Sequence, residues 1–91
     1  MPGYLYILIS IKNGSYYIGC SKNVEERLRQ HNSGTVKATK YKHPYRLVFK
    51  QKFNSIGEAF KAEQKIKGWK RRDYIDKIVK SGNFFIHHMP S

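Results

Sequence analysis

Acidic residues are scarce in this chain, and cysteine is almost absent. Six Asp and Glu residues stand against eighteen Lys and Arg residues, so the formal net charge is +12 and the isoelectric point is about 10.0. Such an excess of one sign opposes compaction by self-repulsion, which indicates a polyanionic partner such as nucleic acid or an anionic membrane. The single Cys20 excludes an intramolecular disulfide and a multi-cysteine zinc site, and it favours a reducing compartment.

Long hydrophobic runs are missing as well. The longest apolar run covers residues 4–9, whereas a helix needs roughly 20 residues to cross a bilayer. No basic stretch precedes this run, as it would in a signal peptide. No expected helix has a long apolar face opposite Lys and Arg, which disfavours a role at a membrane surface. We therefore expect a soluble, cytoplasmic protein without membrane contacts.

What is present fits one small domain. The chain has 91 residues, of which 40% are hydrophobic and 14% aromatic, and this composition excludes an intrinsically disordered chain. We expect a single domain over residues 1–83 and a C-terminal tail over residues 84–91. The sequence does not decide the oligomeric state, and a monomer is the starting expectation.

Alternation of apolar side chains predicts a hairpin near the N-terminus. It covers residues 4–11, and Asn13-Gly14 is a strong signal for a two-residue type I′ turn. With that turn, Ile9 lies opposite Ile18. The opposite side of the hairpin is then polar and aromatic, with Tyr6 and Tyr17 on it. The core side carries Leu5, Ile7, Ile9, Ile11, Tyr16, Ile18 and Cys20.

Three helices and one more strand follow the hairpin. Each helix start has an Asn, Ser or Asp with an acidic residue three positions later, as in a capping box, and Gly68 is expected to end the second helix. The third strand places Leu47, Phe49 and Phe53 on one side. The order β-β-α-β-α-α predicts an α+β domain with a small three-stranded antiparallel sheet flanked by helices. The expected ranges are 23–32 (helix), 45–53 (strand), 55–67 (helix) and 73–82 (helix).

One acidic residue has no role at a helix start. The other five lie in or at the first turn of an expected helix, where negative charge offsets the macrodipole. Glu63 lies in mid-helix, on a stripe with Ile56, Ala59, Phe60 and Ile66. A carboxylate on an apolar stripe is costly unless it pairs with a cation or binds a metal. Both readings stay open, a salt bridge to a nearby cation and a metal ligand.

Two further pairs of residues share a face. Arg27 and His31 lie four positions apart on the first expected helix. Such a pair can hold a phosphate oxygen and steer a proton, but the spacing is also typical of a solvated helix face. Tyr6 and Tyr17 share one face of the sheet, where tyrosines either pack or stack on bases.

Taken in order, these motifs resemble a known family, the GIY-YIG nuclease superfamily. Tyr4-Leu5-Tyr6 and Tyr17-Ile18-Gly19 are similar to its paired motif, and the segment from Arg27 to Gly34 is similar to its helix with Arg and His. The resemblance continues through residues 47–49 to Glu63, and it is strongest to small stand-alone bacterial members. Tyr4 stands where the family usually has glycine, and we expect the exposed strand position to accept it.

The resemblance implies a divalent-metal-dependent endonuclease that hydrolyses phosphodiester bonds. We expect structure-selective or nonspecific action on DNA, which is favoured over RNA, although the sequence leaves the choice between them open. Related domains occur in homing endonucleases and in the DNA repair excinuclease C subunit. The match implies one Mg²⁺ or Mn²⁺ ion, held by Glu63. Tyr6 matches the general base, Tyr17 positions water or phosphate, Arg27 stabilises phosphate charge, and His31 orients the tyrosine or shuttles its proton. Asn83 would match a family asparagine after the glutamate.

Basic residues are expected to give a salt-sensitive grip on phosphates. We expect no additional DNA-binding domain, so a second hypothesis is a non-catalytic or partner-dependent nucleic-acid-binding module on the same scaffold. We also expect nearby cations to favour the phenolate of Tyr6, whose unperturbed pKa is near 10. The residues expected to contact nucleic acid are Lys37, Lys40, Lys42, Lys67, Lys70, Arg71 and Arg72.

Overall fold

The computed structural model describes residues 1–82 of the chain. The expected boundary after residue 83, the tail over 84–91 and Asn83 lie outside the described residues. The element order β-β-α-β-α-α is the expected one, and it confirms the α+β class. The elements are β1 (Gly3–Ser10), β2 (Tyr16–Ser21), α1 (Val24–Asn32), the 3₁₀ helix η1 (Lys37–Thr39), β3 (Tyr45–Phe53), α2 (Ile56–Trp69) and α3 (Arg72–Ser81).

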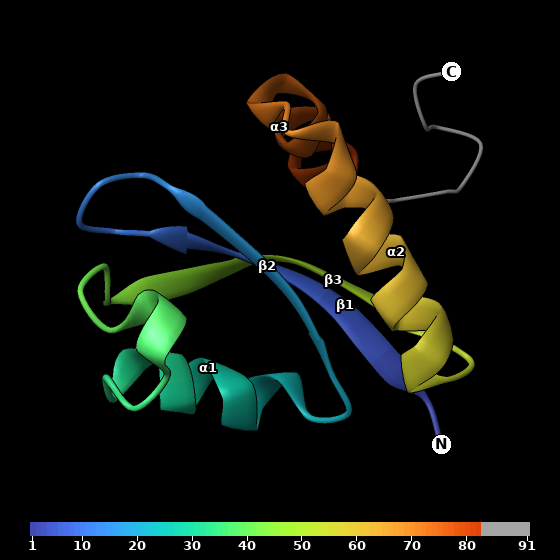
Figure 1. Cartoon of the computed structure of the whole chain (residues 1–91), viewed down its shortest axis with the longest axis horizontal. Helices are drawn as coiled ribbons and strands as arrows, with labels where there is room; N and C mark the ends of the chain where they lie inside the picture. Colours follow the sequence, from blue (N-terminus) through green and yellow to red (C-terminus); the bar gives the residue numbers. More distant parts are fainter. Residues whose placement is uncertain (83–91) are drawn as a thin grey trace.

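The sheet has three antiparallel strands with β1 in the centre, in the order β2-β1-β3. Helix α1 covers one face of this sheet, while α2 and α3 cover the other (Figure 1). Residues 5–8 of β1 are all buried, since both faces of the central strand pack against helices. The prediction that the face of Tyr6 is polar is therefore wrong: it forms a second small core, made by Tyr6, Leu8, Val24 and Tyr45.

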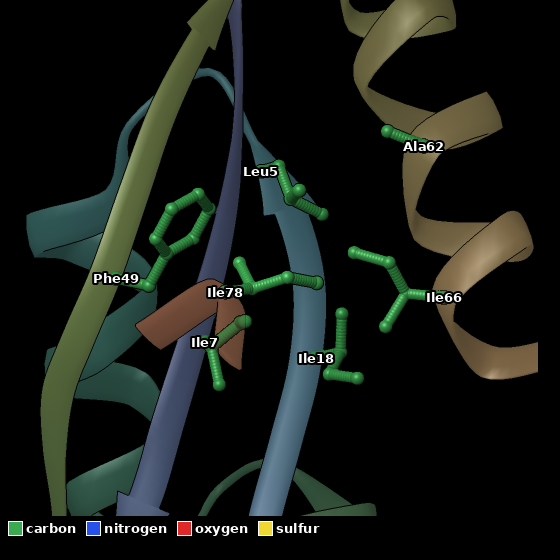
Figure 2. Packing of buried hydrophobic residues seen from close by; sticks show 7 residues of the cluster. All are labelled: Leu5, Ile7, Ile18, Phe49, Ala62, Ile66 and Ile78. Atoms are coloured by element: carbon green, nitrogen blue, oxygen red, sulfur yellow. The ribbon is translucent and has the colours of Figure 1, made fainter. Parts of the chain in front are cut away.

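The main core lies between the sheet and helices α2 and α3 (Figure 2). Ile11, expected in this core, is instead exposed because the chain has already left the sheet. Gly3 lets the first turn of α2 approach β1, since a Cβ atom there would lie 2.5 Å from Cα of Ile56. The buried members of the core are Leu5, Ile7, Ile18, Phe49, Ala62, Ile66 and Ile78.

The hairpin between β1 and β2 is longer than the two-residue turn that the sequence predicts. Ile9 pairs with Tyr16, not with Ile18. Ser10 N donates to the carbonyl oxygen of Ser15 at 2.8 Å, which closes a four-residue loop over residues 11–14 with Gly14 at φ 75°. The register moves by two positions, an even number, so the paired side chains of β1 and β2 keep their predicted faces.

A β-bulge in β3 changes which of its side chains share a face of the sheet. Ile7 pairs with Phe49, but Leu8 pairs with Leu47, so Val48 is an extra residue in the ladder. Leu47 consequently packs against the core on the α1 side, while Phe49 belongs to the core on the α2 side. The prediction that Leu47 shares a side with Phe49 and Phe53 is wrong.

Side-chain caps start the first two helices as expected. The side chain of Asn23 accepts from Glu26 N at 3.1 Å, and that of Ser55 accepts from Glu58 N at 3.2 Å. Helix α2 does not end at Gly68: it continues to Trp69, and Lys70 then takes a left-handed conformation at φ 52°.

Helix α3 begins one residue earlier than expected, at Arg72, and Gly82 ends it at φ 74°. Asp76, expected at the helix start, lies beyond the first turn and accepts from the hydroxyl of Tyr16 at 2.5 Å. On α2, Phe60 is exposed and Ala62 is buried in its place, so the apolar stripe is rotated from its predicted position.

Candidate active site

Tyr6 is the buried centre of the candidate site. Only 1% of the residue is exposed. Its phenol lies across Gly19 of the neighbouring strand, because a Cβ atom at Gly19 would lie 2.6 Å from the phenol oxygen. Glycine is thus required at position 19 to leave room for the phenol. The sequence points to Gly19 only through the Tyr17-Ile18-Gly19 motif, and its packing role is visible only in the fold.

The imidazole of His31 forms a hydrogen bond with the phenol of Tyr6. Tyr6 Oη and His31 Nε2 are 3.0 Å apart, and His31 Nδ1 lies 2.8 Å from the hydroxyl of Thr39. That hydroxyl donates to the carbonyl oxygen of Val36, so Nδ1–H donates to Thr39, and Nε2 is left to accept from Tyr6. Burial, with a smaller contribution from the charge of Arg27, lowers the pKa of His31 to about 4. The imidazole is therefore neutral at physiological pH.

The placement of His31 decides between two readings of the first helix. His31 is fully buried, which excludes the solvated-face reading for this residue. Arg27 is half-buried and donates to Gln30 Oε1 at 2.8 Å. Arg27 also acts on Tyr6, since its hydrogen bonding and its charge both lower the pKa of the phenol. The structure thus brings Arg27, His31 and Tyr6 together.

The protonation of Tyr6 differs from the expectation. Burial is the largest influence on the phenol and raises its pKa above the ordinary value of 10.0, outweighing the opposing effect of Arg27. The nearby negative charge of Glu63 acts in the same direction as burial. Tyr6 is accordingly a neutral phenol in this structure, and the expected phenolate is not favoured by the protein alone.

Tyr17 packs against both His31 and Tyr6. Its ring centroid is 4.7 Å from that of His31 and 6.5 Å from that of Tyr6. Tyr45 closes the group at 6.5 Å from Tyr17. Tyr17 is half-buried, whereas Tyr6 is not exposed, so Tyr17 forms the accessible edge of this aromatic cluster. Packing is thus one role of these tyrosines.

Glu63 reaches the cluster from the opposite layer. Its carboxylate is buried on α2, and Oε2 accepts from Lys67 Nζ at 2.6 Å. Of the two interpretations of Glu63, the salt bridge to a nearby cation is therefore present in the structure. The charge of Glu63 also raises the pKa values of Tyr6 and Cys20, the latter to about 11 with burial as the largest cause. Glu63 therefore acts electrostatically on Tyr6 of β1 and on Cys20 of the edge strand β2.

The donor set suits a cation that needs few protein ligands. No group of three or more His, Cys, Asp or Glu side chains that could hold a metal occurs within residues 1–82. Mg²⁺ retains most of its waters and is often bound by one or two carboxylates together with substrate phosphates. Glu63 is a buried carboxylate whose charge acts on Tyr6, and it fits that chemistry, whereas it does not fit a zinc site.

Asn32 and Thr39 position parts of the site, and neither role is predicted from the sequence. The amide of Asn32 accepts from Tyr45 N at 2.6 Å and donates to the carbonyl oxygen of Tyr45 at 3.1 Å, which joins the end of α1 to the start of β3. The sequence draws attention to Asn32 only because it follows His31 in the segment that matches the family. Thr39, which holds the imidazole, had no signal, because the eight positions that separate it from His31 carry no helical or strand periodicity.

The predicted nucleic-acid contacts are all exposed but do not lie on one element. Three of them belong to η1 or lie just after it, on the α1 side of the sheet. The other four lie around the junction of α2 and α3, on the opposite side of the sheet (Figure 1). Several are already paired: Arg71 with Asp73 at 2.7 Å and Lys67 with Glu63. Their contact with nucleic acid stays a prediction. The seven residues are Lys37, Lys40, Lys42, Lys67, Lys70, Arg71 and Arg72.

Comparison with known proteins decides the family. The family model described as GIY-YIG catalytic domain matches residues 2–76. The chain belongs to the GIY-YIG family. This confirms the resemblance seen in the paired tyrosine motifs. Within residues 1–82, no helix of this GIY-YIG domain has the length and apolar character that a membrane crossing needs.

The similar proteins are small bacterial proteins named UPF0213. One from Staphylococcus saprophyticus is 38% identical over 80 residues, covering 87% of this chain and 95% of that protein. Another from Streptococcus pneumoniae is 42% identical over 69 residues, covering 75% of this chain and 69% of that protein. The solution NMR structure of a UPF0213 protein from Bacillus halodurans has a TM-score of 0.55 and 36% identity, covering 91% of this chain and 88% of that one.

Proposed function

We propose that this GIY-YIG domain is a divalent-metal-dependent endonuclease that hydrolyses phosphodiester bonds in DNA, with structure-selective or nonspecific action. The observation that carries the proposal is the contact between Tyr6 Oη and a neutral His31 Nε2, beside Arg27 and Glu63. A phenol whose pKa is shifted by burial and nearby charges, with a proton acceptor at hydrogen-bond distance, is typical of a site that moves a proton.

In the proposed reaction Tyr6 removes a proton from the attacking water while its own proton passes to His31 Nε2. An isolated phenolate would be costly here, because burial raises the pKa of Tyr6. The relay instead leaves Tyr6 a neutral phenol and His31 an imidazolium, because Tyr6 gains the proton of the water as it loses its own. The oxygen of the water bonds to phosphorus, the bond between phosphorus and the leaving oxygen breaks, and the leaving oxygen takes a proton from solvent. Thr39 keeps the imidazole oriented through its contact with Nδ1.

In the proposed reaction, cations stabilise the negative charge on the scissile phosphate. The Arg27 guanidinium acts on Tyr6 by hydrogen bonding and charge, and a guanidinium offers paired N–H donors that phosphate oxygens accept. Glu63 would hold the divalent ion, Mg²⁺ or Mn²⁺. When bound, that ion supplies further charge stabilisation to the phosphate oxygens.

Cleavage of supercoiled, single-stranded and branched DNA in Mg²⁺ or Mn²⁺ tests the proposal, beside a Glu63→Gln variant shown by circular dichroism to be folded. We expect nicking that requires the divalent ion and falls at least about 100-fold in the variant. DNA binding should remain, since Glu63 is not a phosphate ligand. Equal cleavage by the variant and the wild type would reject Glu63 as the metal site.

A second function is favoured by one observation. The carboxylate of Glu63 is already paired with Lys67, which is what a binding module without metal chemistry would show. In that case the domain binds nucleic acid through its basic residues and cleaves none of the substrates, in either metal ion. Binding without cleavage on every substrate is the result that selects this alternative.

A further inference from the structure

Lys67 reaches into the candidate site from an exposed position. Its Nζ is 2.6 Å from Glu63 Oε2 and 5.9 Å from the centroid of the Tyr17 ring. The side chain of Lys67 is 45% exposed, whereas that of Glu63 is only 9% exposed. The ammonium of Lys67 therefore lies between a buried carboxylate and the accessible edge of the aromatic cluster.

This position conflicts with a divalent ion at the same carboxylate. A buried carboxylate needs a cation, and Lys67 is the ion-pair partner that Glu63 has within residues 1–82. An ammonium at hydrogen-bonding distance occupies one carboxylate oxygen, and its charge repels a second cation placed a few ångströms away. Metal and ammonium are thus alternatives at Glu63.

We propose that Lys67 is an internal counter-ion that competes with the divalent metal for Glu63 and is drawn off by the phosphate of the substrate. The inference rests on the proposed metal site at Glu63. A metal site at Glu63 without this competition would not couple the binding of metal to the binding of phosphate through Lys67. Because the phosphate removes the competitor, metal and nucleic acid bind this domain cooperatively, each raising the affinity for the other by the same factor.

The two partners differ in how easily they can move. Glu63 is held by burial in the middle of α2, four residues before Lys67. Lys67 has a flexible four-carbon stem, and its side chain is 45% exposed, so rotation about the stem can carry its ammonium into solvent. The exchange requires a rotation of the Lys67 side chain alone, with no change in the backbone.

Calorimetric titration of Mn²⁺ into the metal-free protein, without nucleic acid, tests the competition. We expect Lys67→Gln to bind Mn²⁺ roughly 3- to 10-fold more tightly than the wild type, since the competing charge is gone. Lys65→Gln is the matched control: it removes the same charge from the same helix, and Lys65 has no ion pair within residues 1–82. Its Mn²⁺ affinity should stay within about twofold of wild type.

The second arm repeats the titration with thymidine 5′-monophosphate, which offers a phosphate but no phosphodiester to cleave, corrected for metal binding by the nucleotide. We expect the nucleotide to raise the Mn²⁺ affinity of the wild type and to have a smaller effect on Lys67→Gln. Equal Mn²⁺ affinities for the wild type, Lys67→Gln and Lys65→Gln would overturn the competition. Absence of Mn²⁺ binding in all three proteins, at the level of Glu63→Gln, would instead reject the metal site itself.

Discussion

At the phenol of Tyr6, burial and cation charge act in opposite directions. Burial raises the pKa and Arg27 lowers it, with burial the larger. His31 offers the proton a place to go without requiring a free phenolate. Tyr6 and His31 therefore share one proton, and neither group has an ordinary pKa.

The pH dependence of cleavage follows from these shifts. The relay starts from a neutral Tyr6 phenol, whose pKa is raised above 10.0, and a neutral His31 imidazole, whose pKa is about 4. Both groups keep these protonation states between about pH 6 and 9. We therefore expect the rate of the chemical step to change little over that range and to fall as the pH drops toward 4, where His31 becomes protonated. Tyr6→Phe should lose most of the rate at every pH. A rate that rises about tenfold per pH unit between about pH 6 and 9, with chemistry rate-limiting, would argue instead for a free phenolate of Tyr6 as the base.

Protonation of His31 should also appear in the stability of the fold. The folded pKa of about 4 lies below the unfolded value of 6.5, so the unfolded state binds more protons between these values. Stability should be complete above about pH 6.5 and fall by of order 2 kcal/mol as the pH drops toward 4. Urea unfolding at several pH values measures this. His31→Gln should lower the overall stability and flatten that part of the curve.

Gly19 offers a test of how tightly the phenol is held. We expect Gly19→Ala to displace Tyr6 and to cost cleavage more than stability, because the added Cβ atom would lie 2.6 Å from the phenol oxygen. Gly68→Ala is the control: no atom lies within 4 Å of its Cβ position, and alanine favours a helix interior by roughly 0.5–1 kcal/mol. Activity of Gly19→Ala equal to wild type would show that the phenol has room to move.

At the scale of elements, the site depends on how α1 meets β3. The side-chain amide of Asn32 bonds both the N–H and the carbonyl of Tyr45 across this junction. His31, its neighbour, is positioned by the same turn of helix. The bulge at Val48 then changes the face on which β3 places its side chains, so that Leu47 covers the α1 side and Phe49 the α2 side.

Removal of that junction should destabilise the domain. We expect Asn32→Ala to lower the free energy of unfolding by about 2 kcal/mol, because two backbone groups of Tyr45 lose their partner. Ser33→Ala, one position later on an exposed residue, should cost less than about 0.5 kcal/mol. Denaturant unfolding of both variants measures the difference, and equal costs would mean that the amide of Asn32 is replaced by water.

At the scale of the whole molecule, charge dominates. A net charge of +12 is carried by a small domain whose candidate nucleic-acid contacts are on both sides of the sheet. Phosphate contacts of this kind release counterions and make affinity fall steeply with salt. Some of the cations are already neutralised by local acids, so equal charge does not imply an equal contribution.

The salt dependence of DNA binding can separate these cations. In metal-free buffer, fluorescence anisotropy at several KCl concentrations gives the slope of log affinity against log salt. Lys70→Gln should reduce the magnitude of that slope by about 1 if Lys70 contacts a phosphate. Arg71→Gln should reduce it less, because Arg71 is paired with Asp73 at 2.7 Å. Slopes unchanged in both variants would place the contact surface elsewhere.

The sequence by itself determined the element order, the third strand, two side-chain caps and the family, because these depend on neighbours within a few positions along the chain. Capping, periodicity and the spacing of Arg27 and His31 are local properties of that kind. The tertiary structure decided the hairpin register, the bulge at Val48 and the burial of both sheet faces, each of which depends on packing between distant segments. It also decided the protonation of the site: burial, which no local pattern measures, keeps Tyr6 a phenol and His31 neutral.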